Sequence, residues 1–425
     1  MSYFQNNTQI AFAWVVLVCV SLLPGPAHAQ EDVIQFLKNS LADVQNQLKD
    51  ALVRIEQLER EKQTQVAAPA QTASAPSESG PSAGQQSPGA KGIFSSLNPA
   101  ISVNGLFLGG YSTNAKRTGR ITGLDFHNGF NLQEAEIQFT ADVDPYWKAN
   151  LIVAIDREGS VGVEEGYVTS EELPYDLLPS NTTLKLGKFV AAFGKHNLLH
   201  AHQFPFISQP LINQAAFGGE GVREPGLGVS YLLPSSWFSE LTLQAMAGEN
   251  EALFRLADDK RRGAYLGHWK NFFDLSDETT LEAGASFLAG RNSNKGQPWS
   301  KAAGADLTMK WRPSNERALV WQSEYVYFSR DRDRINSPRG GGLYSSLQYQ
   351  FARRWWIQGR YDLLGIPKLD DGRKHRWSTL LAFVMSEFSA IRLQHSYTAS
   401  DRGGPLNEVL LQFNFTIGSH PAHQY

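Results

Sequence analysis

The fold is decided by a segment near the C-terminus that reads Val409-Leu410-Leu411-Gln412-Phe413-Asn414-Phe415-Thr416-Ile417. Every odd position in this segment is apolar, and the even positions are mostly polar. A period of two places alternate side chains on opposite faces of a β-strand. The same alternation recurs in Leu-Glu-Ala-Gly-Ala-Ser-Phe, residues 281–287, and over 134–141, 303–311 and 355–363. These segments therefore predict strands with one apolar face and one polar face.

Runs of this kind follow one another through the last three quarters of the chain. We count about sixteen, over 100–112, 130–143, 147–156, 162–171, 182–190, 225–234, 239–248, 263–273, 279–289, 302–312, 318–329, 341–351, 354–364, 375–385, 388–399 and 406–417. No stretch here approaches 18 consecutive apolar residues, which excludes a transmembrane helix. Alternating strands of about ten residues in an even number are typical of outer-membrane proteins. The sequence predicts an all-β fold, a transmembrane antiparallel β-barrel of about 16 strands over 99–425.

The connections between the runs support this prediction. Those after even-numbered strands are mostly tiny, such as 144–146 and 313–315, whereas those after odd-numbered strands are longer and glycine-rich or charged. Short turns on one side and long loops on the other are the outer-membrane pattern. Aromatic residues cluster beside the short turns, where rings favour a membrane–water boundary. They are Tyr146, Trp147, Trp237, Phe238, Phe272, Phe273, Trp311, Phe351, Trp355, Trp356 and Phe388.

The composition agrees with a barrel and excludes other classes. The net charge is −3, so the chain lacks the basic surface of a nucleic-acid binder. Aromatic residues reach 11% although the mean hydropathy is slightly polar, because a barrel averages lipid-facing and lumen-facing positions. We find neither Gly-x-Ser-x-Gly nor His-Glu-x-x-His, so no enzyme is expected.

Three segments precede the barrel. Residues 1–29 contain an apolar run and end in Ala27-His28-Ala29, which predicts a cleaved signal peptide. The single cysteine, Cys19, lies inside it, so the mature chain is expected to have neither disulfide nor cysteine–metal site. Residues 30–62 carry four heptads and predict a periplasmic coiled coil that assembles the protein, with a single amphipathic helix as the alternative. Residues 63–98, rich in Ala, Pro, Ser, Gln and Gly, predict a flexible linker.

Charged residues at the second parity of each strand are expected to face the lumen. If such a residue faced lipid instead, it would destabilise the barrel by about 2–4 kcal/mol near the bilayer midplane. The mixture of signs argues against strong selectivity for anions or cations. The pore-lining candidates are Glu134, Glu136, Lys148, Asp156, Lys185, Glu282, Asp306, Lys310, Glu324, Arg360, Asp362 and Arg392.

The longest outer connection runs over 191–224 and is rich in large apolar residues. A loop this apolar should not stay in water, so we expect it to fold into the lumen and narrow the pore. Packing on a neighbouring subunit or on the barrel rim is the alternative. Its candidate charges are Lys195, Glu220, Arg223 and Glu224.

The same loop carries His196, His200 and His202. A His-x3-His pair on a helical turn would place two imidazoles on one face, as a transition-metal site requires. A second pair, His420 and His423, follows the last strand. The alternative is that these are polar loop histidines, with no cofactor bound.

The chain resembles the phosphate-selective porin O and P family. The resemblance rests on Leu-Gly-Lys-Phe-Val-Ala-Ala-Phe-Gly at 186–194, ahead of the long third outer loop, and on the strand number and the N-terminal coiled coil. It implies a trimeric, passive, solute-selective pore. The lysine and arginine ladder of the phosphate-selective members is absent here, so the resemblance does not extend to phosphate specificity. Residues 200–206 and 420–425 also resemble outer-membrane proteins described as zinc-regulated.

Together these features predict an outer-membrane porin for small hydrophilic solutes or ions, assembled as a homotrimer through the coiled coil and the barrel. The alternative is a zinc- or other metal-linked outer-membrane transporter or receptor that uses the loop histidines.

Overall fold

The computed structural model describes residues 99–254, 263–292, 299–330, 339–367, 369 and 372–418. The predicted signal peptide, coiled coil, linker and the His420–His423 pair lie outside the described residues. Within the described part, no helix combines the length and apolar character needed to cross a membrane.

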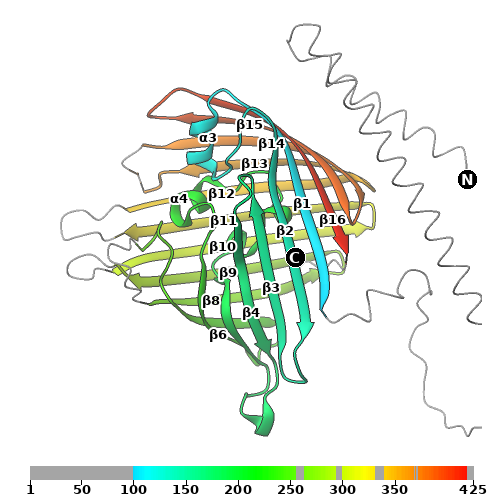
Figure 1. Ribbon diagram of the computed structural model, residues 1–425, viewed down its shortest axis with the longest axis vertical. Helices are drawn as coiled ribbons and strands as arrows, with labels where there is room; N and C mark the ends of the chain where they lie inside the picture. Colours follow the sequence, from blue (N-terminus) through cyan, green and yellow to red (C-terminus); the bar gives the residue numbers. More distant parts are fainter. Residues whose placement is uncertain are drawn as a thin grey trace, which may run out of the picture. The chain divides into compact units, whose positions relative to one another are not determined.

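The described chain forms one closed antiparallel β-barrel (Figure 1). Each strand pairs with the next along the chain, and β1 closes the ring by pairing with β16. The strands are β1 (Ala100–Ser112), β2 (Gly129–Asp142), β3 (Lys148–Asp156), β4 (Val161–Ser170), β5 (Thr182–Val190), β6 (Arg223–Leu232), β7 (Phe238–Met246), β8 (Ala264–Ser276), β9 (Thr279–Arg291), β10 (Trp299–Ser314), β11 (Arg317–Arg330), β12 (Arg339–Ala352), β13 (Trp355–Leu364), β14 (Lys374–Ser386), β15 (Ser389–Ser400) and β16 (Leu406–Gly418). The predicted 16-strand all-β barrel is confirmed, and the predicted strand ends differ from these by a few residues.

Alternation along the strands sorts the side chains as expected. On β16, Leu411 and Phe413 are 37% and 39% exposed, whereas Gln412 between them is fully buried. The apolar residues therefore face outward and the polar residues inward. In a soluble protein the apolar residues face the core. The reversed arrangement seen here keeps polar side chains away from lipid hydrocarbon.

The outward face should reject charge most strongly at mid-strand. Leu393 lies near the middle of β15 and is 47% exposed, whereas Leu275 lies at the end of β8 and is 58% exposed. We expect Leu393→Arg to destabilise the folded barrel by about 2–4 kcal/mol and Leu275→Arg by about 0–1 kcal/mol. Urea unfolding in lipid vesicles checks this. Equal effects at the two sites would contradict a membrane-spanning barrel.

The connections mostly follow the predicted alternation of long and short lengths. The turns at 277–278, 315–316, 353–354 and 387–388 are tight, and the long loops lie at the other end of the barrel. The β3–β4 connection at the long-loop end is short, and the β4–β5 connection at the short-turn end is long enough to hold the 3-10 turn η1 (Pro174–Asp176). Trp356, predicted to belong to the aromatic girdle, packs inward against a buried cluster because its parity on β13 is that of Arg360.

Four short helical segments lie in the long loops. The helix α3 (Ala115–Thr122) belongs to the β1–β2 loop, and its N-terminus is capped by Asn114. The β5–β6 connection holds two 3-10 turns, η2 (His196–Leu198) and η3 (Ala201–Gln203), and the helix α4 (Leu211–Phe217). This loop spans 191–222, because Arg223 and Glu224 already pair with Val190 and Phe189 as the first residues of β6. The predicted loop boundary at 224 is corrected accordingly.

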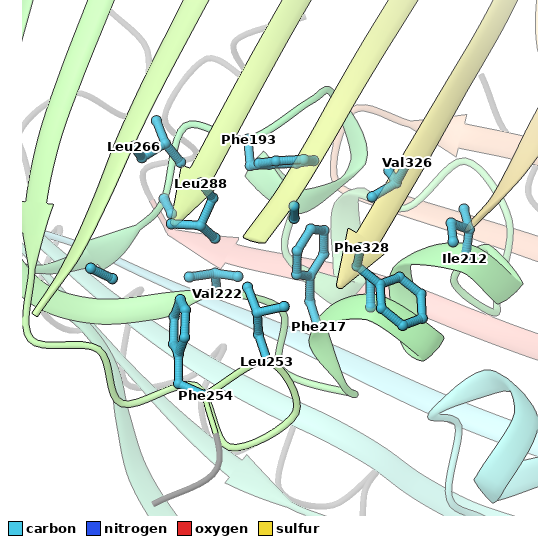
Figure 2. Close-up of a cluster of buried hydrophobic side chains, with 14 of the residues drawn as sticks. Phe193, Ile212, Phe217, Val222, Leu253, Phe254, Leu266, Leu288, Val326 and Phe328 are labelled. Atoms are coloured by element: carbon cyan, nitrogen blue, oxygen red, sulfur yellow. The ribbon is translucent and has the colours of Figure 1, made fainter. Parts of the chain in front are cut away.

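The β5–β6 loop packs on the inner faces of distant strands. The helix α4 contacts β11, β12 and β13, on the wall across from β5. Phe193 and Phe217 meet edge to face with ring centroids 4.9 Å apart, among inward-facing Leu288, Val326 and Phe328 (Figure 2). All five side chains are at most 2% exposed. The loop therefore forms an apolar core inside the barrel.

Candidate functional site: the loop inside the barrel

The loop crosses the interior along a series of hydrogen bonds to the strands. The backbone N–H of Gly194 donates to Ser286 of β9 at 2.9 Å, and that of His196 donates to Glu324 of β11 at 3.1 Å. Further along, the N–H of Ile207 donates to Gln394 of β15 at 2.7 Å. A segment that leaves β5 can reach these three strands together only by passing through the lumen.

Arginines of β13 to β15 hold the loop by its backbone carbonyls. Arg360 donates to the Ser208 carbonyl at 2.7 Å, and Arg392 donates to the Phe204 and Pro205 carbonyls at 2.6 and 2.7 Å. Charged donors make stronger hydrogen bonds than neutral ones, particularly where water is excluded. These arginines, predicted as pore-lining residues, are covered by the loop that they anchor.

The remaining contacts on this wall involve acids and Arg376. Asp362 accepts from the Leu211 N–H at 3.1 Å and from Arg360 Nε at 2.9 Å. Arg376 donates to Ser208 Oγ at 3.0 Å and forms an ion pair with Glu408 at 2.9 Å. The side chains of Arg376 and Glu408 are fully buried.

On the β8 to β12 wall, Lys195 of the loop reaches Glu282 at 2.7 Å, and Lys270 approaches the same carboxylate at 3.8 Å. Glu324 is 1% exposed and also accepts from the Tyr344 hydroxyl at 3.2 Å. Both acids therefore act as loop anchors. The other two candidates on this wall lie on β10, where Asp306 is buried and Lys310 is half-buried.

The β2 to β6 wall carries most of the remaining charges. Arg223 donates to Glu164 at 2.6 Å and to Glu220 at 3.1 Å, and the Glu220 side chain is 82% exposed. Glu224 instead accepts from the backbone N–H groups of Gly248 and Asn250, at 2.6 and 2.8 Å, and so fixes the β7–β8 loop.

The other candidates on this wall lie apart from one another. Lys185 of β5 lies 4.2 Å from the Tyr167 ring centroid in a cation–π contact. Lys148 is exposed at the first position of β3. Asp156 ends the same strand, and its carboxylate closes the β3–β4 turn by accepting N–H groups of Glu158 and Ser160.

The predicted His-x3-His face does not form. His196 begins η2 and His200 is the N-cap residue of η3, and the chain is extended at Leu199 between them. The His196 ring packs against the Phe204 ring, with centroids 4.5 Å apart and the ring planes tilted by 35°. His200 instead lies among carboxylates, with Nδ1 2.8 Å from Glu164 and Nε2 2.7 Å from Glu165.

Burial, with the nearby charge of Arg360, lowers the pKa of His196 to about 3. A histidine with a depressed folded-state pKa stabilises the structure fully above its unfolded pKa of about 6.5, and this contribution is lost as the pH falls towards the folded value. We therefore expect the protection factors of the loop amides, which correct for the intrinsic pH dependence of exchange, to fall between pH 6.5 and pH 4.

Hydrogen exchange of residues 191–222 checks this. Glu324, Tyr344 and Arg360 face the ring and also titrate or carry charge, so His196→Gln serves as the comparison. The variant should have lower protection factors at pH 7, and they should depend less on pH than those of the parent. An identical pH dependence in both proteins would contradict the assignment to His196.

Two of the residues that hold the loop do not follow the alternation of inward and outward side chains along a strand. Glu164 and Glu165 are adjacent, yet both reach His200, because the β3–β4 register shifts beside them between Ile152 and Val153. A bulge places consecutive residues on the same face. The sequence signal for this bulge was the presence of two adjacent glutamates in one strand, because strict alternation would place one of them in lipid. Arg376 and Glu408 needed no such signal, since alternation along β14 and β16 already places both side chains inside the barrel.

The loop leaves a cavity of about 270 Å³ beside the β2 to β4 wall. Its lining includes Arg157 and Arg223 and a larger number of acids, namely Asp125, Glu134, Asp156, Glu158, Glu164 and Glu220. Clefts lined mainly by one sign of charge concentrate ions of the opposite sign. This cavity therefore attracts cations.

Comparison with known proteins supplies a relative and the fold. The chain is 32% identical over 344 residues to an uncharacterized protein of Aquifex aeolicus (strain VF5), with 71% of each chain covered. No family model matches the chain. Salmonella typhi OmpF in complex with daunomycin has a TM-score of 0.50 at 10% identity, over 75% of this chain and 97% of that chain. The outer membrane channel DcaP of Acinetobacter baumannii has a TM-score of 0.49 at 10% identity, over 75% and 96%. At such identities the likeness to OmpF shows the fold alone.

Proposed function

We propose that this chain, which belongs to the same family as the Aquifex aeolicus protein, is an outer-membrane porin for passive diffusion of small hydrophilic solutes or ions. The observation that carries the proposal is a closed barrel with apolar residues outside and charged residues inside. Sixteen strands give a barrel wide enough for an aqueous channel. The loop 191–222 narrows this channel.

The charges around the loop 191–222 are expected to set the ion selectivity of the channel. Arg360 of β13 and Arg392 of β15 bind loop carbonyls and are covered by the loop, so we expect the acidic cavity beside β2 to β4 to have the larger influence on permeating ions. We therefore expect a modest preference for cations and no phosphate specificity, in line with the absence of a lysine and arginine ladder from the sequence.

Planar-bilayer recording tests the proposal. Purified mature chain should give stable conductance steps, and the reversal potential in asymmetric potassium chloride should have the sign of a cation-preferring pore. Heat-denatured protein is the control. The absence of steps from protein shown to be folded would overturn the porin proposal, and a strong anion preference would overturn only its selectivity.

We also propose that the protein is a homotrimer located in the outer membrane. The strands β3 to β7 have only 9–10 residues each, at the lower limit for crossing a bilayer, and would be the wall best covered by a neighbouring subunit. Light scattering in detergent should give three chains per particle. A single chain per particle would contradict the trimer.

A further inference from the structure

His200 lies between carboxylates from two strands of the same wall, β2 and β4. Its Nδ1 is 2.8 Å from Glu164 Oε2 and 3.3 Å from Glu136 Oε2. The ligand atoms of Glu136, Glu164 and His200 all lie within 4.8 Å of one another. His202 joins them from the same loop, with its Nδ1 3.4 Å from Glu136 Oε2.

These separations suit a tetrahedral metal ion. Zinc–nitrogen and zinc–oxygen bonds of about 2.0–2.2 Å imply ligand atoms about 3.3–3.5 Å apart. The contacts of Glu136 with His200 and His202 already have this spacing. Of these three contacts, the one between His200 and Glu164 would need to widen, by roughly 0.5 Å.

The groups behind the ligands are also those of a metal site. A metal-bound histidine usually donates its other ring N–H to a carboxylate, which fixes the ring and its tautomer. Here Nε2 of His200 lies 2.7 Å from Glu165, whose other oxygen accepts the Val190 N–H at 3.0 Å. Arg223 holds the outer oxygen of Glu164 at 2.6 Å. Both carboxylates next to His200 on β4 are therefore fixed from behind.

A second observation points to a cation at this position. Glu136 is 1% exposed, and neither of its oxygens accepts a hydrogen bond of good geometry in the described structure. A buried carboxylate without such donors is costly unless a cation compensates it. Glu164 also lines the acidic cavity described above, which offers a path for the ion.

We propose that His200, His202, Glu136 and Glu164 bind one divalent transition-metal ion of the zinc class. Imidazole and carboxylate ligands in a small buried site suit such an ion. Metal binding displaces the proton from Nδ1 of His200, while Nε2 keeps its proton and donates it to Glu165 in a hydrogen bond. The ion ties the loop to β2 and β4, on a different wall from the arginine anchors of β13 to β15. The proposal concerns binding to the folded barrel and does not depend on the chain being a channel.

Cobalt and zinc titration of the full chain in detergent tests the site. An untagged protein in which His420 and His423 are alanine removes background from the C-terminus. We expect one Co²⁺ per chain with the strong visible absorption of tetrahedral coordination, and its displacement by one Zn²⁺. Absence of saturable binding would overturn the proposal, and so would a weak octahedral spectrum, which indicates surface adsorption only.

Variants decide which residues bind the metal. His200→Ala and Glu136→Gln should abolish the tetrahedral spectrum, and Glu165→Gln should weaken binding by about 10–100-fold. Exposed His127→Ala is the control and should bind as the parent does. Heat-modifiable gel mobility shows whether each variant is folded. If His200→Ala does not fold, the two glutamine variants decide, and parental binding in both would overturn the assignment.

Discussion

Replacing Phe217 by alanine should raise the single-channel conductance and make the open channel noisy. Phe217 ends α4, is 2% exposed and packs edge to face on Phe193 within the apolar core inside the barrel. Truncating a buried phenylalanine typically costs about 3–5 kcal/mol. Because the barrel is closed by its own strand pairing, this loss falls on the seating of the loop. The loop should therefore leave the lumen part of the time and open the constriction.

The comparison for this prediction is Leu198→Ala. Leu198 lies in the same loop but is 41% exposed, so its truncation should leave conductance unchanged. Hydrogen exchange of 191–222 should be faster in Phe217→Ala alone. If the loop exchanges faster while conductance stays at the parental value, the loop does not set the width of the pore.

The second large effect is expected at Arg376. Its side chain and that of its ion-pair partner Glu408 are fully buried, 2.9 Å apart. Removing one partner of a buried pair typically destabilises a protein by about 3–5 kcal/mol, because the other charge stays buried without compensation. We expect Arg376→Ala to lower the free energy of unfolding by this amount in urea titrations, and to loosen the contact with Ser208 as well.

Two further variants test whether the unpaired charge causes the loss of stability in Arg376→Ala. Arg373→Ala removes an exposed arginine nearby and should change stability little. The double change Arg376→Met with Glu408→Leu removes both charges and should restore most of the lost stability. If the double variant were as unstable as Arg376→Ala, the uncompensated charge would not be the cause.

Most of the barrel could be predicted because its physics is local. Each strand must place apolar side chains towards lipid and polar ones inward. Segments such as 409–417 therefore alternate apolar and polar residues with a period of two. The long-loop and short-turn ends follow from the spacing of these segments. The exceptions at β3–β4 and β4–β5 are also present in the predicted strand ranges, which leave only residues 157–161 for the first connection and residues 172–181 for the second.

The site was harder to predict because its contacts are not local. The apolar character of the loop indicated burial, but which strands would hold it depends on partners such as Arg360 and Arg392, far away in sequence. The parity rule identified charges that point inward without showing that the loop covers several of them. The pairing of His196 with His200 failed because an extended Leu199 separates their turns.

Labelling of adjacent engineered cysteines on β2 tests the central claim most directly. Gln138 points inward, where it donates to Asn150 at 3.0 Å, and Phe139 has the opposite parity and lines a groove on the outer surface. In a background without Cys19, a charged, membrane-impermeant thiol reagent should react with Gln138→Cys in vesicles and lower its channel conductance in steps. Phe139→Cys should stay unreactive, with unchanged conductance. Reaction at Phe139→Cys but not at Gln138→Cys would contradict a barrel with a water-filled interior.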